Sequence, residues 1–268
     1  MSKNILKYQE TRLIKSRKKK SKGWLVLLMC IVMVGGVIML SSTLSGALTV
    51  GNFGFNFSSS ALKVKAHSYY AVTMGEYDTL NEAETVASGT SVMGAGSYIW
   101  NTDKKYVVIG NVYDNLEDAK KVKDNITDTN YNIGIREIKY KKVNCDLKEL
   151  TKEQRTVIKS NLNYINELYD KCYNYSIKYD KGEIVATVVS SELNSLNGNI
   201  KVNCSRLDSI NSVTVIPPTL KLKNAYVAIS NEIDSAVLKV IQGSSANRDL
   251  KYLTTSIAII KYNLYEQL

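Results

Sequence analysis

Two stretches of the chain repeat one pattern: residues 72–78 read VTMGEYD and residues 107–114 read VVIGNVYD. Each runs from apolar or β-branched residues through Gly and an aromatic residue to Asp. Each is followed by an acidic segment that contains Ala83 or Ala119, and the second carries one extra residue before this segment. Val, Ile, Tyr and Thr favour strands, whereas Gly and Asp end them. The repeat predicts a duplicated strand–helix unit; the alternative is two unrelated strand–helix pieces.

Two further strands are predicted around this repeat. Residues 97–101 (SYIWN) and 132–143 (NIGIREIKYKKV) are rich in aromatic and β-branched residues. Thr79 precedes Glu82 by three residues, which is the spacing of a helix capping box. The order strand–helix–strand–strand–helix–strand predicts a ferredoxin-like βαββαβ sheet, antiparallel and four-stranded, with both helices on one face. The two helices are expected at residues 80–88 and 116–125.

The net charge of the chain is concentrated at its beginning. Residues 1–23 carry nine basic and one acidic side chain, or +8 of the total +10, which leaves +2 for residues 24–268. This balance argues against nucleic-acid binding. The uncharged stretch that begins with WLVLLMCIVMVGGVIML (residues 24–40) is long enough to span a bilayer, for which about 20 residues suffice. The pattern predicts a transmembrane helix over residues 24–48.

The positive-inside rule places residues 1–23 in the cytoplasm as a basic tail that contacts anionic lipid. The prediction is a single-pass protein of the cell membrane whose remaining chain is extracytoplasmic. Ser45-Gly46-Ala47 is a passable cleavage site, so a cleaved signal peptide is the alternative to an anchor. Residues 49–66, rich in Gly, Asn and Ser, predict a flexible linker.

Residues 144–268 have a different pattern from residues 67–143. Apolar residues recur at helical spacing, which predicts a helical bundle that could contact protein partners. Pro217-Pro218 mark a break, and residues 183–196 are ambiguous between helix and strand. The clearest helical runs are residues 148–179, 223–242 and 250–264.

Residues 69–143 resemble the SPOR domain, the sporulation-related repeat family of bacterial cell-division and cell-wall proteins. The resemblance implies that residues 67–143 bind peptidoglycan glycan strands that lack stem peptides, at division or sporulation septa. The family's frequent first-strand glutamine falls on Thr73 here. The fold class is predicted as α+β: a transmembrane helix, a SPOR-type domain and a C-terminal helical bundle. The resemblance is carried by Tyr69, Tyr70, Thr73, Gly75, Tyr77, Ala83, Tyr106, Gly110 and Ala119.

One face of the predicted sheet is expected to be open for the glycan. Strand alternation directs Tyr70, Val72 and Met74, with Val107 and Ile109, toward the helices. Aromatic rings on the other face suit the apolar faces of sugars. The alternative is that another domain covers these aromatic residues. The candidate glycan-binding residues are Tyr69, Thr73, Tyr98, Trp100, Tyr106 and Arg136.

Catalytic motifs are missing from the sequence. The single histidine, His67, excludes a multi-histidine metal site, and neither GxxxxGK[ST] nor GxSxG occurs. Glycosidases need two carboxylates across a cleft, and Glu76, Asp78 and Asp103 lie in no such pattern. We therefore expect no catalytic residue, metal or cofactor. Alternatives are a scaffold with a degenerate SPOR-like domain that binds proteins and, with less support, a wall-cleaving hydrolase or an RNA binder.

Three cysteines fall in the predicted extracytoplasmic part: Cys145, Cys172 and Cys204. An odd number allows at most one internal disulfide, and the spacings do not form CxxC pairs. We expect buried free thiols.

Overall fold

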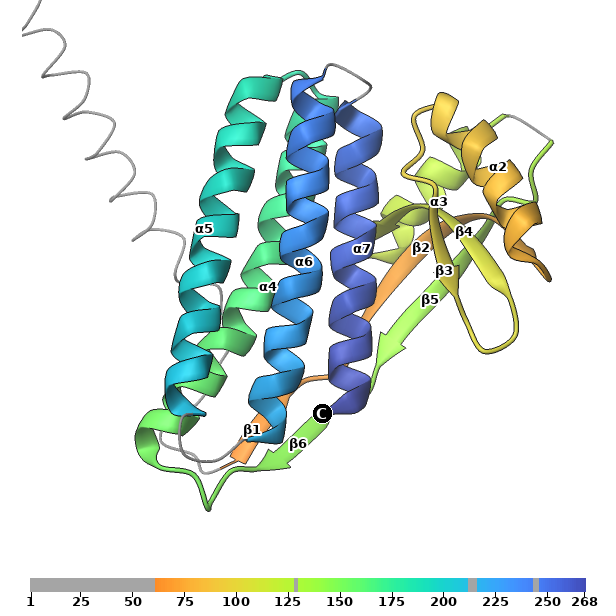
Figure 1. Ribbon diagram of the computed structural model, residues 1–268. Helices are drawn as coiled ribbons and strands as arrows, with labels where there is room; N and C mark the ends of the chain where they lie inside the picture. The colour runs from red at the N-terminus through yellow and green to blue at the C-terminus, as the bar shows by residue number, and fades with distance from the viewer. Residues whose placement is uncertain (1–60, 128–129, 212–215, 243–245) are drawn as a thin grey trace, which may run out of the picture. The chain divides into compact units, whose positions relative to one another are not determined.

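The computed structural model describes residues 61–127, 130–211, 216–242 and 246–268. Six helices make up 62% of this part of the chain, and the strands form one small sheet and one short ribbon (Figure 1). The predicted tail, transmembrane helix and residues 49–60 of the predicted linker lie outside the described residues.

The sheet has four antiparallel strands in the order β3-β4-β2-β5. Helices α2 (Leu80–Val92) and α3 (Leu116–Asn125) cover one of its faces, where they enclose a small apolar core. The strands are β2 (His67–Tyr77), β3 (Tyr98–Asn101), β4 (Tyr106–Tyr113) and β5 (Gly134–Tyr140).

A two-stranded ribbon extends the sheet. Strand β1 (Ala61–Val64) pairs with β6 (Val143–Asp146), in the same register that joins β2 to β5. Leu62 and Val64 are buried. The last part of the range predicted as a linker is therefore a strand, because two apolar residues of a four-residue segment find a partner 80 residues away, which the local pattern does not reveal.

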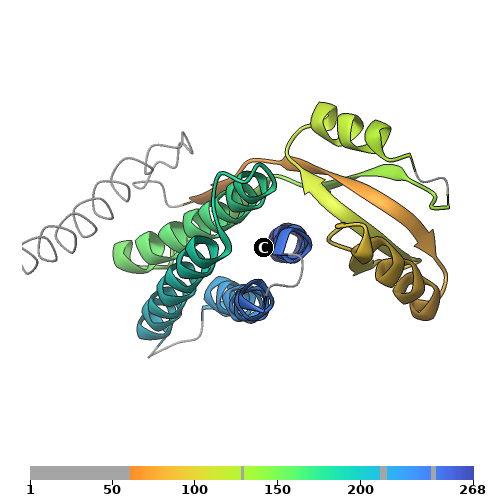
Figure 2. The same cartoon turned by 90° about the horizontal axis from the view of Figure 1, so that it is seen from above.

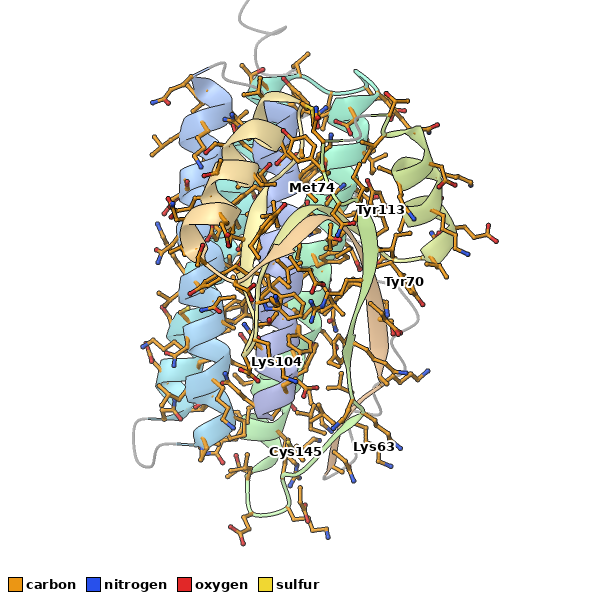
Figure 3. The ribbon with its side chains drawn as sticks, turned by 90° about the vertical axis from the view of Figure 1, so that its right-hand side faces the viewer. Lys63, Tyr70, Met74, Lys104, Tyr113 and Cys145 are labelled. Atoms are coloured by element: carbon orange, nitrogen blue, oxygen red, sulfur yellow. The ribbon has the colours of Figure 1, made fainter. Side chains whose placement is uncertain are left out.

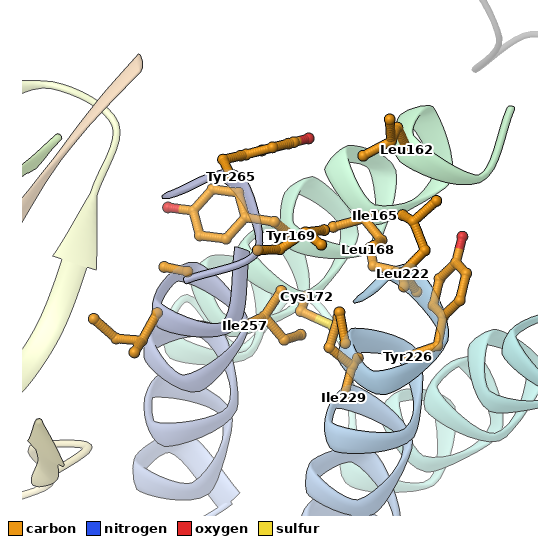
Figure 4. Close-up of a cluster of buried hydrophobic side chains, with 14 of the residues drawn as sticks. Leu162, Ile165, Leu168, Tyr169, Cys172, Leu222, Tyr226, Ile229, Ile257 and Tyr265 are labelled. Atoms are coloured by element: carbon orange, nitrogen blue, oxygen red, sulfur yellow. The ribbon is translucent and has the colours of Figure 1, made fainter. Parts of the chain in front are cut away.

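Four long helices follow the ribbon. The prolines predicted as a break occupy the first turn of α6, where the missing N–H costs nothing because it has no helical partner. The ambiguous residues 183–196 enter α5 from Ala186 onward. The helices are α4 (Lys152–Asp180), α5 (Ala186–Ile210), α6 (Pro217–Ile241) and α7 (Ala246–Gln267). Figure 4 shows their apolar contacts, such as Leu168, Ile229 and Ile257.

Helix α7 lies directly on the second face of the sheet, between the sheet and the other helices (Figure 2). Ala71, Val107 and Ile138 from the sheet belong to the same buried cluster as Leu162 and Ile257 from the helices. The predicted α+β class, with a sheet domain followed by a separate bundle, is therefore wrong. The described part of the chain is mostly helical, and its small sheet and long helices share one hydrophobic core. The physical reason is that β2 and β4 are apolar on both faces, so both must be covered.

The predicted transmembrane helix and membrane localisation also need correction. Among the residues that the structure describes, no helix is both long and apolar enough to cross a membrane. The long helices α4 to α7 are amphipathic and bury their apolar sides against one another. Residues 24–48, on which the prediction rested, are not among the described residues.

The predicted capping box of α2 is present. Thr79 Oγ1 accepts a hydrogen bond from Glu82 N at 3.3 Å, and Glu82 Oε2 accepts one from Thr79 N at 3.2 Å. Thr79→Ala is expected to lower the free energy of unfolding by about 1 kcal/mol, because the N–H group of Glu82 loses its acceptor at the start of the helix. Urea denaturation measures the change, and Thr79→Ser serves as control because it keeps the hydroxyl. Equal stability of the alanine and serine variants would contradict the prediction.

Candidate functional site

The six residues predicted to bind glycan do not share one open face. Tyr69 has no exposed surface, because it lies beneath α4 and α7 with its ring 4.7 Å from that of Tyr169. Tyr98 packs against Tyr252 of α7, with ring centroids 5.2 Å apart. Burial, with smaller contributions from Tyr252 and Glu232, raises the pKa of Tyr98 to about 12. Both positions fit the alternative given in the sequence analysis, in which another part of the protein covers the aromatic rings.

Thr73 is buried and Tyr106 is partly buried, on opposite faces of the sheet. Thr73 is 5% exposed, and a side chain at Gly134 on the neighbouring strand would crowd its hydroxyl. Tyr106 packs with the core beneath α2 and α3. Neither side chain is placed to contact a polymer on the bundle-facing side of the sheet.

The faces of β4 are the reverse of those predicted. Val107 and Ile109 face the bundle, and Val108 faces α2 and α3 with Tyr106. Alternation could not decide this, because residues 107–109 of β4 (VVI) are all apolar. The pairing of β2 with β4 also skips Met74 on one strand and Gly110 on the other, so the two strands form a double bulge.

Trp100 and Arg136 are only partly buried, and with Glu76 and Tyr262 they form what we call the Trp100 corner. Arg136 Nη1 donates a hydrogen bond to Glu76 Oε1 at 2.7 Å. The guanidinium carbon of Arg136 lies 5.3 Å from the centre of the Trp100 ring, and Tyr262 of α7 meets Trp100 edge-on at 5.7 Å. The corner thus joins β2, β3, β5 and α7.

The side chains of the corner are partly open to solvent. Arg136 is 34% exposed and Glu76 is 48% exposed. An ion pair with this exposure stabilises a fold by about 0–1 kcal/mol. Arg136 and Glu76 can therefore form hydrogen bonds with a ligand instead of with each other at little cost in stability. Close by, the hydrogen bond from Lys105 to Asp78, together with the charges of Asp78 and Glu76, raises the pKa of Lys105.

Lys261 is a buried charged residue that the sequence pattern did not predict. Lys261 of α7 is 4% exposed, and its Nζ lies 5.3 Å from the ring centres of both Tyr69 and Tyr169. Burial lowers the pKa of Lys261 to about 8, against the opposing effect of Asp170 and Asp114. The spacing of residues could have indicated that Lys261 is buried, because it follows Ile257 by four residues and so lies on the apolar side of α7.

The cysteines and the possible metal ligands form no further site in the described ranges. Cys145, Cys172 and Cys204 are free thiols there. Burial raises the pKa of Cys172 to about 12, so its thiol stays protonated and unreactive. The described residues also hold no group of three or more His, Cys, Asp or Glu side chains able to bind a metal ion.

Comparison with profiles of known protein families, with curated proteins and with solved structures finds no match for this chain.

Proposed function

We propose that the protein is a non-catalytic carbohydrate-binding protein that holds peptidoglycan glycan strands at the Trp100 corner. The observation that carries the proposal is the partly buried ring of Trp100, flanked by the guanidinium of Arg136 and the carboxylate of Glu76. An aromatic ring stacks on the apolar C–H face of a sugar, and the two charged groups bond its hydroxyls. The resemblance of residues 69–143 to the SPOR family supports peptidoglycan as the polymer.

The position of α7 limits how the glycan binds. Tyr69 and Tyr98 lie beneath helices, so the broad sheet face expected from the family resemblance is not offered to a ligand. We therefore propose that a short glycan segment lies along the rim between β3 and α7. The same cover disfavours the RNA alternative, because RNA-binding sheets of this topology stack bases on aromatic residues of their open face.

Sedimentation with purified peptidoglycan sacculi tests the corner directly. Trp100→Ala and Arg136→Gln are each expected to weaken binding of the full-length chain by about tenfold, because Trp and Arg dominate the energetics of small contact sites. Trp100→Phe should retain part of the affinity, because an apolar ring remains. Arg206→Gln, which removes an exposed arginine on α5, is the matched control and should bind like the wild type.

The same assay separates the alternatives. Treating the sacculi with an amidase that removes stem peptides is expected to increase binding. If amidase treatment has no effect, or if Trp100→Ala sediments like the wild type, the proposed ligand or the proposed site is wrong. Release of dye from labelled sacculi would favour the hydrolase alternative.

A further inference from the structure

A cavity of about 310 Å³ lies on the side of the sheet that faces α2 and α3, away from the Trp100 corner. Its walls come from β2 and β4, from the loop after α2, from the end of α3 and from the start of α7. Figure 3 labels Met74 and Tyr113, which contribute from the two strands. Val72, Val122 and Ile126 make the walls mostly apolar.

The double bulge of β2 and β4 shapes this cavity. Met74 and Gly110 are the residues that the strand pairing skips, and both line the cavity. A Cβ atom at position 110 would clash with Met74 Cε, so a larger residue there would displace the flexible end of the methionine. Bulges are commonly found beside functional sites, where they redirect side chains.

One polar group in the cavity has no partner. Asn111 is 6% exposed and donates a hydrogen bond from Nδ2 to Tyr113 Oη at 3.3 Å, whereas its Oδ1 is buried without a partner in the described part of the chain. Turning the amide over would only exchange the atoms, leaving Nδ2 without an acceptor. A buried polar atom of this kind is costly until something bonds to it.

The cation at the cavity wall is already engaged. Lys251 Nζ donates a hydrogen bond to Gly94 O at 3.1 Å and lies 3.6 Å from Asp180 Oδ2. The positive charge is therefore balanced within the protein, which favours a neutral ligand over an anion.

We propose that this cavity binds a neutral, mostly apolar molecule of two fused rings that carries one hydroxyl group, which bonds to the Asn111 amide. A cavity of about 150 Å³ suffices for benzene, so one twice as large accommodates a bicyclic ligand. A hydroxyl group both donates and accepts, and it therefore satisfies Asn111 in either amide orientation. Met93, half exposed at the rim, leaves a route of entry beside Gly94.

Titration of the full-length chain with 2-naphthol and with naphthalene tests the proposal. Ala95→Phe, which places a ring in the cavity from a loop position, is expected to abolish saturable binding of both probes. Asn111→Leu is expected to weaken 2-naphthol binding about tenfold while leaving naphthalene unchanged, because only the hydroxyl uses the amide. Near-ultraviolet circular dichroism establishes that both variants are folded.

Two results would overturn the proposal. One is a folded Ala95→Phe variant that binds both probes as the wild type does, which would place the binding elsewhere. The other is an Asn111→Leu variant that changes the affinities for 2-naphthol and naphthalene by the same factor, which would remove the hydrogen bond from the recognition. Absence of saturable binding of either probe to the wild type would equally count against it.

Discussion

Replacing Tyr69 with alanine is expected to lower the free energy of unfolding by about 4 kcal/mol, the largest effect that we expect of any single substitution in this protein. The Tyr69 side chain is completely buried where β2 meets α4 and α7. Its ring lies 4.6 Å from His67 and 4.7 Å from Tyr169, so its removal leaves a cavity between the sheet and the helices.

The hydroxyl group of Tyr69 provides a matched control. Its oxygen is buried and has no hydrogen-bond partner in the part of the chain that the structure describes. Tyr69→Phe is therefore expected to leave stability unchanged or to raise it, since the ring is kept and an unsatisfied polar atom is removed. Urea denaturation of both variants measures the two effects. Similar losses in the alanine and phenylalanine variants would show that the hydroxyl, not the packing, is what matters.

Replacing Lys261 with methionine is expected to raise the free energy of unfolding near pH 7 by up to about 3 kcal/mol. The pKa of Lys261 is lowered to about 8 in the folded protein, chiefly by burial, from an ordinary value of 10.5. Methionine has a similar length and no charge to bury. Burial raises the pKa of Asp170 and the charge of Lys261 opposes this shift, so the loss of that charge offsets part of the gain.

The same pKa shift predicts a pH dependence. Between about pH 8 and pH 10.5 the unfolded chain binds the Lys261 proton more tightly than the folded chain does, so stability rises with pH in this window. Above about pH 10 the buried tyrosines act in the opposite direction. Burial raises the pKa of Tyr69, Tyr169 and Tyr265, and stability is lost as these groups ionise on unfolding.

Unfolding measurements from pH 7 to pH 11 test this prediction. The wild type is expected to reach maximal stability near pH 9 to 10, whereas Lys261→Met should show no rise above pH 8. Lys201→Met, at an exposed position of α5, is the control for loss of one positive charge. A wild-type profile that stays flat from pH 8 to pH 10 would contradict the buried position of Lys261.

Local features of the fold were predictable from the sequence because their causes are local. The capping box at Thr79 follows from a side chain and a backbone N–H three residues apart. The faces of β2 were predicted in the same way, and Tyr70 and Val72 do pack toward α2 and α3. Within the candidate site, Trp100 and Arg136 were proposed from their residue types and strand positions, whereas Tyr262 was not.

What only the tertiary structure decided is which faces are covered and by what. The strand β4 is apolar on both sides, so its sequence carries no preference for the helices of the sheet or for α7. The burial of Tyr69 depends on α4 and α7, which follow it by about 100 and 190 residues. Hydrophobic burial has no direction and no fixed range along the chain, whereas a helix cap acts over three residues. For this reason the sequence located most of the helices and the strands of the four-stranded sheet, but not β1 or the start of α5. The three-dimensional structure was needed to find which aromatic residues remain accessible to a ligand.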